Sequence, residues 1–233
     1  MSAPIKPPAR MPGSAEVEAF LARSAQLPAA RASGRGRLIF ALDATMSRQP
    51  TWDLAQALQA RMFDAAGRFG GLDVQLVYYR GLAECRASPF VSQGRGLAEL
   101  MARIACRSGS TQIEKVLRHV RDESRAARVG AFIFVGDAVE ESEEALYAIA
   151  GELGLLGVKG FLFQEGENAV PARVFQAIAR LTGGAYATFD ASAPARLASL
   201  LSAAAAYAAG GRAALESQAR EDGGARLLLS QMR

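Results

Sequence analysis

RLIFALDATMS, residues 37–47, is the stretch of sequence that decides the fold. Its first six residues form an almost continuous apolar run, which is typical of a strand buried on both faces of a parallel sheet. Asp43, Thr45 and Ser47 follow that run directly, at alternate positions. Since ligands of doubly wound sheets bind where the parallel strands end, this pattern predicts a central strand that leads into a polar site.

Strand patterns alternate with helix patterns along the rest of the chain. Short apolar or β-branched runs predict strands, and apolar residues at helical spacing predict helices. The predicted strands are 37–42, 73–79, 84–87, 131–135, 158–163 and 185–189, and the predicted helices are 51–69, 96–105, 111–127, 141–153, 171–181 and 194–209. This order predicts an α/β fold: a doubly wound, mostly parallel six-stranded sheet with one short antiparallel edge strand and helices on both faces.

The length of 233 residues, half of them hydrophobic, suits one domain with a sizeable core. We expect this domain at residues 36–210. Residues 1–35 contain several prolines and no strand pattern, so they are expected to form an N-terminal arm. Residues 211–233 are expected to form a C-terminal tail, for which docking on the domain, swapping and disorder all stay open.

Composition narrows the classes of partner. The net charge is +4, but the basic residues are scattered along the chain, which disfavours nucleic-acid binding. No uninterrupted apolar run reaches about 18 residues, so no membrane span is expected. Cys85 and Cys106 lie far apart and outside any CxxC unit, which favours a reducing, cytoplasmic location.

Three polar features follow or precede predicted strands. Besides Asp43, Thr45 and Ser47, these are SGST at 108–111, which opens a helix, and Asp137, directly after the strand at 131–135. If the strands at 37–42 and 131–135 are neighbours, all three features meet in one crevice. Carboxylates and hydroxyls without His or Cys suit Mg²⁺, or alternatively Mn²⁺ or Ca²⁺, and do not suit zinc.

These residues resemble the von Willebrand factor A family over about residues 37–209. That family's metal-ion-dependent adhesion site reads Asp-x-Ser-x-Ser, then Thr, then Asp, and Asp43, Thr45, Ser47, Thr111 and Asp137 match it in order. The resemblance implies that the three hydroxyls bind the metal directly, that the two carboxylates act mainly through water, and that a partner's Asp or Glu completes the shell. Small bacterial members often work beside AAA+ ATPases or in stress operons, which implies such a protein partner here.

Two departures from the family pattern bear on the metal. Thr45 stands where the family has the first Ser, which retains the hydroxyl and adds a methyl group. Asp137 lies between Gly136 and Ala138, where many members have Thr-Asp-Gly. These departures affect metal choice and the shape of the turn, respectively.

A rim for the partner is expected around the metal. Gln49, Trp52, Ser110 and Glu140 lie close in sequence to the predicted ligands. Tryptophan is enriched at interface hot spots, although Trp52 also suits core packing at the start of its helix. The hydroxyl residues are also suited to capping the helices that follow them.

Two other functions compete with the adhesion site. A magnesium-dependent phosphatase would use Asp43 as its nucleophile, but Thr45 stands where the haloacid dehalogenase-like pattern has its second Asp. The only histidine, His119, lies on a helix pattern and is expected to be a surface or half-buried residue rather than a base. We therefore expect no enzyme activity. The remaining alternative is a metal-free von Willebrand factor A-like scaffold.

Overall fold

The computed structural model describes residues 34–190 and 192–232, which form a sheet with the strand order β3-β2-β1-β4-β5-β6. The strands are β1 (Gly36–Asp43), β2 (Leu72–Arg80), β3 (Glu84–Val91), β4 (Ala131–Gly136), β5 (Lys159–Glu165) and β6 (Ala185–Phe189). All neighbours are parallel except β2 and β3. The predicted fold class is confirmed.

Strand β1 lies in the middle of the sheet, between β2 and β4. Its register runs from Leu38 opposite Ala131 to Leu42 opposite Val135, so the two apolar runs singled out in the sequence are neighbours. The strand order reverses between β1 and β4, because β2 and β3 continue on one side and β5 and β6 on the other. Asp43 ends β1 at this switch point.

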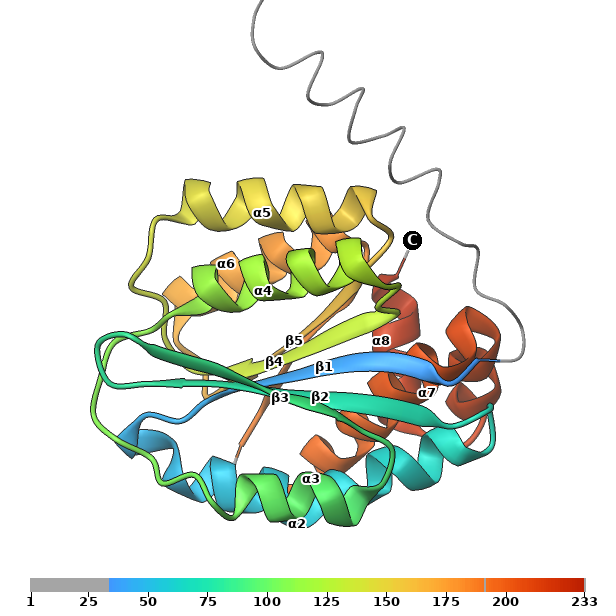
Figure 1. The fold of residues 1–233 in the computed structure, drawn as a ribbon. Coiled ribbons are helices and arrows are strands. Elements are labelled where there is room, and N and C mark those ends of the chain that lie inside the picture. The colour runs from blue at the N-terminus through green and yellow to red at the C-terminus, as the bar shows by residue number, and fades with distance from the viewer. Residues whose placement is uncertain (1–33, 191, 233) are drawn as a thin grey trace, which may run out of the picture.

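Helices cover both faces of the sheet (Figure 1). The helices α4 (Ile113–Ala126), α5 (Glu143–Leu155) and α6 (Ala169–Thr182) pack on one face, around Phe132, Phe134 and Phe175. The other face carries α2 (Gln49–Gly67), α3 (Gly94–Met101), α7 (Pro194–Ala219) and α8 (Gly223–Gln231). A short 3₁₀ helix, η1 (Met46–Arg48), joins β1 to α2.

Two elements are longer than the sequence pattern predicts. Strand β3 extends to Val91 rather than ending at residue 87, and the Ser88 hydroxyl accepts a hydrogen bond from Leu76 N, 3.0 Å away, where the register shifts. Helix α7 continues past residue 209 to Ala219. Gly211 (φ 68°, ψ −157°) kinks it, so the glycine pair that predicts a helix end instead redirects the helix.

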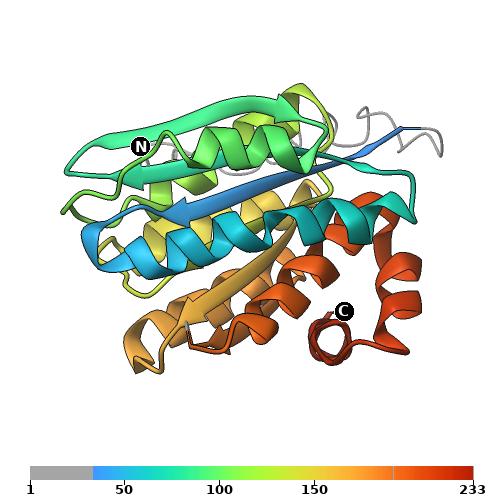
Figure 2. The same cartoon turned by 90° about the horizontal axis from the view of Figure 1, so that it is seen from below.

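The C-terminal segment docks on the domain, one of the three alternatives left open by the sequence. Asp222 caps α8 by accepting a hydrogen bond from Ala225 N at 2.7 Å, and it also accepts one from Ser199 of α7. The Gln231 side chain bonds to both backbone groups of Tyr186 in β6. Figure 2, which views the molecule from below, shows α7 beside α2 and the C-terminal helix next to α7. The predicted arm at 1–35 lies outside the described residues except for Gly34 and Arg35.

None of the helices in the described part of the chain is long and apolar enough to cross a membrane.

Candidate functional site

Asp43 occupies the centre of the predicted site. Only 4% of its surface is exposed, and its Oδ1 accepts a hydrogen bond from Thr45 N at 2.7 Å. This contact turns the chain sharply out of the sheet, because a carboxylate that bonds the amide two residues ahead mimics a backbone turn. Thr45 then begins η1 with an extended backbone (φ −73°, ψ 160°).

Asp137 lies beside Asp43, because β4 is the neighbour of β1. A Cβ atom on Gly136 would lie 3.9 Å from Asp43 Cβ and within 3.0 Å of the Phe134 ring, so this position has no room for a side chain. Burial raises the pKa of Asp43, Thr45 opposes that rise by hydrogen bonding, and the Asp137 carboxylate adds to it. A nearby cation would relieve this disfavoured pair of negative charges.

The buried side chain of Tyr79 also belongs to the surroundings of Asp43. Tyr79 pairs with Asp43 in the sheet register and is fully buried. Its pKa lies well above the ordinary value because of burial and the carboxylates of Asp43, Glu141 and Asp137. Among the described residues, its hydroxyl has no hydrogen-bond partner of good geometry. A hydrogen bond to the Asp43 carboxylate nevertheless contributes to the raised pKa of Tyr79, so this hydroxyl belongs to the surroundings of Asp43.

Thr111 is buried at the start of α4, but neighbouring glutamates engage its hydroxyl. That hydroxyl donates to the Glu141 carboxylate and accepts from Glu140 N at 2.9 Å. Glu141 also accepts hydrogen bonds from Ile113 N and Glu114 N, so it caps α4. The Thr111 hydroxyl is therefore already engaged by Glu141 and Glu140, and Glu141 is close enough to Tyr79 to raise its pKa.

Arg48 adds a positive charge that the sequence analysis did not anticipate. Its Nη2 lies 3.2 Å from Asp137 Oδ2, and its Nη1 pairs with Glu165 at the end of β5. The hydroxyl of Thr51 also donates to Glu165. The side chains of Arg48 and Glu165 are only 14% and 18% exposed, so this guanidinium is held by two carboxylates and largely shielded. Arg48 follows the motif directly, but a contact with Glu165 leaves no local pattern.

Most of the other predicted residues make local contacts near the surface. Ser47 is exposed and accepts a 3.4 Å hydrogen bond from Arg48 Nε, Gln49 pairs with Asp53, and Ser110 N donates to Gly81 O. These three lie in the segments that follow β1 or precede α4, and the exposed Glu140 accepts a hydrogen bond from Thr111 N at 3.0 Å.

Trp52 does not belong to the rim. It is 1% exposed, its Nε1 donates to Met101 O at 3.3 Å, and its ring meets Tyr78 edge-on. The prediction of a tryptophan anchor at the rim is wrong, because the first turn of α2 directs this side chain into the core. The described residues contain three exposed large apolar side chains in segments at this end of the sheet: Met46, Leu82 and Val170.

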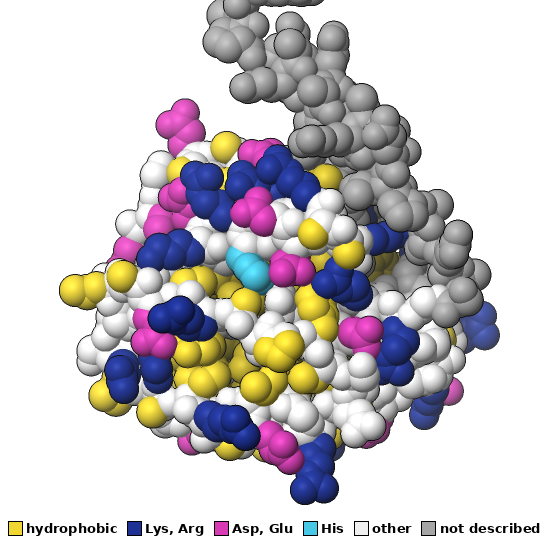
Figure 3. Space-filling model, viewed as in Figure 1, with side chains coloured by type: hydrophobic (Ala, Val, Ile, Leu, Met, Phe, Trp, Pro, Cys, Tyr) yellow, Lys and Arg dark blue, Asp and Glu magenta, His cyan; other side chains and the backbone are white. Residues whose placement is uncertain are grey.

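Two observations limit the chemistry of the site. In the described ranges, no three His, Cys, Asp or Glu side chains gather closely enough to hold a metal ion. A metal here therefore needs hydroxyl and water ligands. His119 is half-buried, and its Nε2 lies 2.8 Å from Gln75 Oε1, away from the candidate ligands. Figure 3 shows it on a face where basic and acidic side chains are interspersed.

Known proteins resemble this chain in structure, whereas comparisons of sequence find no match. No protein-family model matches the chain, and no curated protein is similar to it in sequence. A von Willebrand factor type A protein from Catenulispora acidiphila superposes with a TM-score of 0.58 at 17% identity, over 75% of this chain and 43% of that one. The chain has the von Willebrand factor A fold.

Two further structures share this fold. The human COPII-coat protein Sec24c matches with a TM-score of 0.56 at 14% identity, over 75% of this chain and 32% of its own. The SpRpn10 VWA domain matches with a TM-score of 0.55 at 10% identity, over 70% of this chain and 95% of its own. The chain thus spans less than half of the first two proteins, and at these identities the likeness concerns the fold alone.

Proposed function

We propose that this chain is a protein-interaction module, with its binding face at the end of the sheet that carries Asp43 and Asp137. The observation that carries the proposal is the meeting of these two carboxylates, with hydroxyl side chains around them, where the strand order reverses. Structures of the same fold support an interaction role in general terms.

The proposal includes a divalent cation, Mg²⁺ or alternatively Mn²⁺ or Ca²⁺. Three features of the site fit it: the donors are all oxygens, the Tyr79 hydroxyl is buried without a partner among described residues, and Asp137 disfavours the charged form of Asp43. Asp43, Thr45, Ser47, Thr111 and Asp137 would hold the cation. Once bound, it would offer an open coordination position to an Asp or Glu of the partner.

Metal binding is tested on the full chain by Mn²⁺ electron paramagnetic resonance titration. The wild type should bind one Mn²⁺ in the micromolar to millimolar range, and Asp43→Ala should abolish binding. Asp122→Ala is the matched control, because it removes one carboxylate from an exposed position on α4. Failure of the wild type to bind, or equal binding by Asp43→Ala, rejects the metal site.

The surroundings suggest the chemistry of the partner. Met46 (59% exposed) and Leu82 (84% exposed) are apolar, and exposed apolar side chains near a polar site mark interaction surfaces. A partner acidic residue flanked by apolar residues would match them. Fluorescence anisotropy compares labelled 15-residue peptides with a central Leu-Asp-Leu or Ser-Asp-Ser sequence in the presence of Mg²⁺. We expect tighter binding of the first peptide, and loss of that preference in Leu82→Ser.

A second candidate, metal-free binding, is favoured by one observation. Arg48 already provides a positive charge between Asp137 and Glu165. A partner carboxylate could then meet this guanidinium instead of a metal. Arg48→Ala separates the two mechanisms: it should increase Mn²⁺ affinity if the metal site operates, because Asp137 is released. If Arg48 itself receives the partner, Arg48→Ala should abolish peptide binding, and EDTA should have no effect.

We propose no catalytic role for Asp43. Its carboxylate is buried and turned toward Thr45 N, and Thr45 leaves no general acid at the following motif position. An assay with p-nitrophenyl phosphate and Mg²⁺ should show no turnover; hydrolysis lost in Asp43→Asn would reverse this conclusion. An AAA+ ATPase or stress-operon partner and a cytoplasmic location stay predictions.

A further inference from the structure

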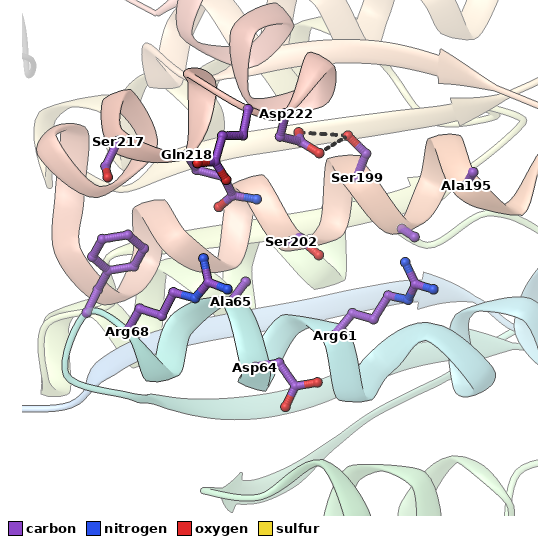
Figure 4. Close-up of a pocket in the computed structure, with 13 residues that line it drawn as sticks. Arg61, Asp64, Ala65, Arg68, Ala195, Ser199, Ser202, Ser217, Gln218 and Asp222 are labelled. Carbon is purple, nitrogen blue, oxygen red and sulfur yellow. Dashed lines mark hydrogen bonds between the residues drawn. The ribbon is translucent and has the colours of Figure 1, made fainter.

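A cavity of about 810 Å³ lies between α2, α7 and the turn before α8, on the side of the sheet away from α4 (Figure 4). We call it the α2–α7 cavity. None of the residues that line it belongs to the site around Asp43. Its volume falls in the range of about 300–1,000 Å³ that is usual for small-molecule sites.

The α2 wall presents two arginines without counter-ions. Arg61 and Arg68 make no ion pair or hydrogen bond with any described residue, although many other arginines of the chain do. Both are on one face of α2, about 10 Å apart along its axis, since seven residues separate them. Figure 4 shows both directed toward α7, while Asp64 points away from it.

The α7 wall adds a helix N-terminus and hydroxyl groups. Helix α7 has no side-chain cap and no acidic residue in its first turn, and Ala195 of that turn lines the cavity. Its positive dipole end is therefore left without a negative partner among the described residues. Ser202 also lines the cavity, and the Oε1 atom of Gln218 is buried without a hydrogen bond to any described group.

The carboxylates of the cavity do not neutralise these arginines. Both oxygens of Asp222 lie 2.8 Å from Ser199 Oγ, and Oδ1 also accepts from Ala225 N, so Asp222 serves to cap α8. Glu221 is an exposed residue of the turn. The cavity thus has two arginines without ion pairs on the α2 wall, whereas the opposite wall combines neutral polar groups with the carboxylates of Glu221 and Asp222.

We propose that the α2–α7 cavity binds a small phosphorylated hydroxy acid. The phosphate would lie between Arg61 and the first turn of α7, because guanidinium groups and helix N-termini are the usual phosphate donors in proteins. The carboxylate would pair with Arg68, whose side chain would turn toward Arg61 along α2, because the ligand is shorter than the two helical turns between them. The single ligand hydroxyl would accept a hydrogen bond from Ser202 and donate one to Gln218 Oε1. This inference is independent of the metal site.

Isothermal titration of the full chain with 3-phosphoglycerate at low salt tests the inference. We expect submillimolar binding that weakens about tenfold in Arg61→Ala and in Arg68→Ala, the size of one charge-assisted hydrogen bond. Inorganic phosphate should bind more weakly and be affected mainly by Arg61→Ala, and glycerol should not bind. Both arginines are exposed, so the unfolding midpoints should not change.

Two controls complete the test. Arg180→Ala removes an exposed arginine from α6, on the other face of the sheet, and should bind as the wild type does. Asp43→Ala should also bind normally, which separates this cavity from the proposed metal site. No binding by the wild type, or equal losses in Arg180→Ala and Arg61→Ala, would overturn the inference.

Discussion

The site around Asp43 and the α2–α7 cavity are built from different kinds of side chain. At the first, Asp43, Tyr79 and Arg48 are buried or largely shielded, and Arg48 joins Asp137, which follows β4, to Glu165 of β5. At the second, Arg61 and Arg68 are exposed and make no contact with described partners. The first site is thus held in place before any ligand binds, whereas the second must order two long side chains when it binds.

The largest expected effect comes from Trp52→Ala, because α2 serves both regions. This helix begins beside the Asp43 site and carries the arginines of the cavity. Removing its buried indole should lower the free energy of unfolding by about 3–5 kcal/mol and weaken binding at both places. Urea unfolding measures it, with Leu155→Ala, 56% exposed, as a control that changes stability by less than about 0.5 kcal/mol. A loss below about 1 kcal/mol would contradict the core position of Trp52.

Gly211→Ala should disturb the cavity and leave the Asp43 site intact. The backbone angles of Gly211 are accessible almost only to glycine, so alanine should cost about 1–3 kcal/mol, although no atom lies within 4 Å of the added Cβ. Binding of 3-phosphoglycerate should weaken, because Gln218 lies beyond the kink, while Mn²⁺ binding should not change. Gly151→Ala, in the regular helix α5, should instead gain up to about 1 kcal/mol.

Tyr79→Phe should change the Asp43 site alone. Loss of an unsatisfied buried hydroxyl should raise the free energy of unfolding without metal by about 1 kcal/mol and lower Mn²⁺ affinity if that hydroxyl orders the metal's water. Its neighbour Tyr78 donates a 3.0 Å hydrogen bond to Glu84, so Tyr78→Phe should lose about 1 kcal/mol and leave Mn²⁺ affinity unchanged. Equal stability changes in the two variants would show that the Tyr79 hydroxyl has a partner.

His119 gives the smallest effect and involves neither region. Burial lowers its pKa from the ordinary 6.5, against the opposing effects of Glu123 and Asp122. The unfolded chain therefore takes up this proton first, so the free energy of unfolding should fall as the pH drops through 6.5 toward the lowered pKa. Urea unfolding between about pH 5 and 8 should show that His119→Gln removes this part of the pH dependence. An unchanged profile would show that Gln75 accommodates the charged ring.

Local patterns predicted the strands well, and the structure supplied the condition left open for Asp43 and Asp137, that β1 and β4 are neighbours. Two buried apolar runs, each followed by a carboxylate, have few other arrangements in a parallel sheet. The contacts of Arg48 were missed because Glu165 lies 117 residues away in sequence. The prediction that Trp52 lies at the rim of the site was wrong, because position in the sequence does not tell which face of α2 is buried. The ligand roles of Thr45, Ser47 and Thr111 stay predictions.

The sequence by itself determined the α/β order, the central strand and the carboxylate that ends it, because these depend on short-range periodicity of apolar residues. Only the tertiary structure decided which charges are neutralised. It placed Arg48 between Asp137 and Glu165, engaged Thr111 with Glu141, and docked the C-terminal helices beside α2 to form a cavity with two unpaired arginines. The physical reason is that ion pairs and cavities depend on side chains brought together from distant segments, and no local pattern records such a meeting.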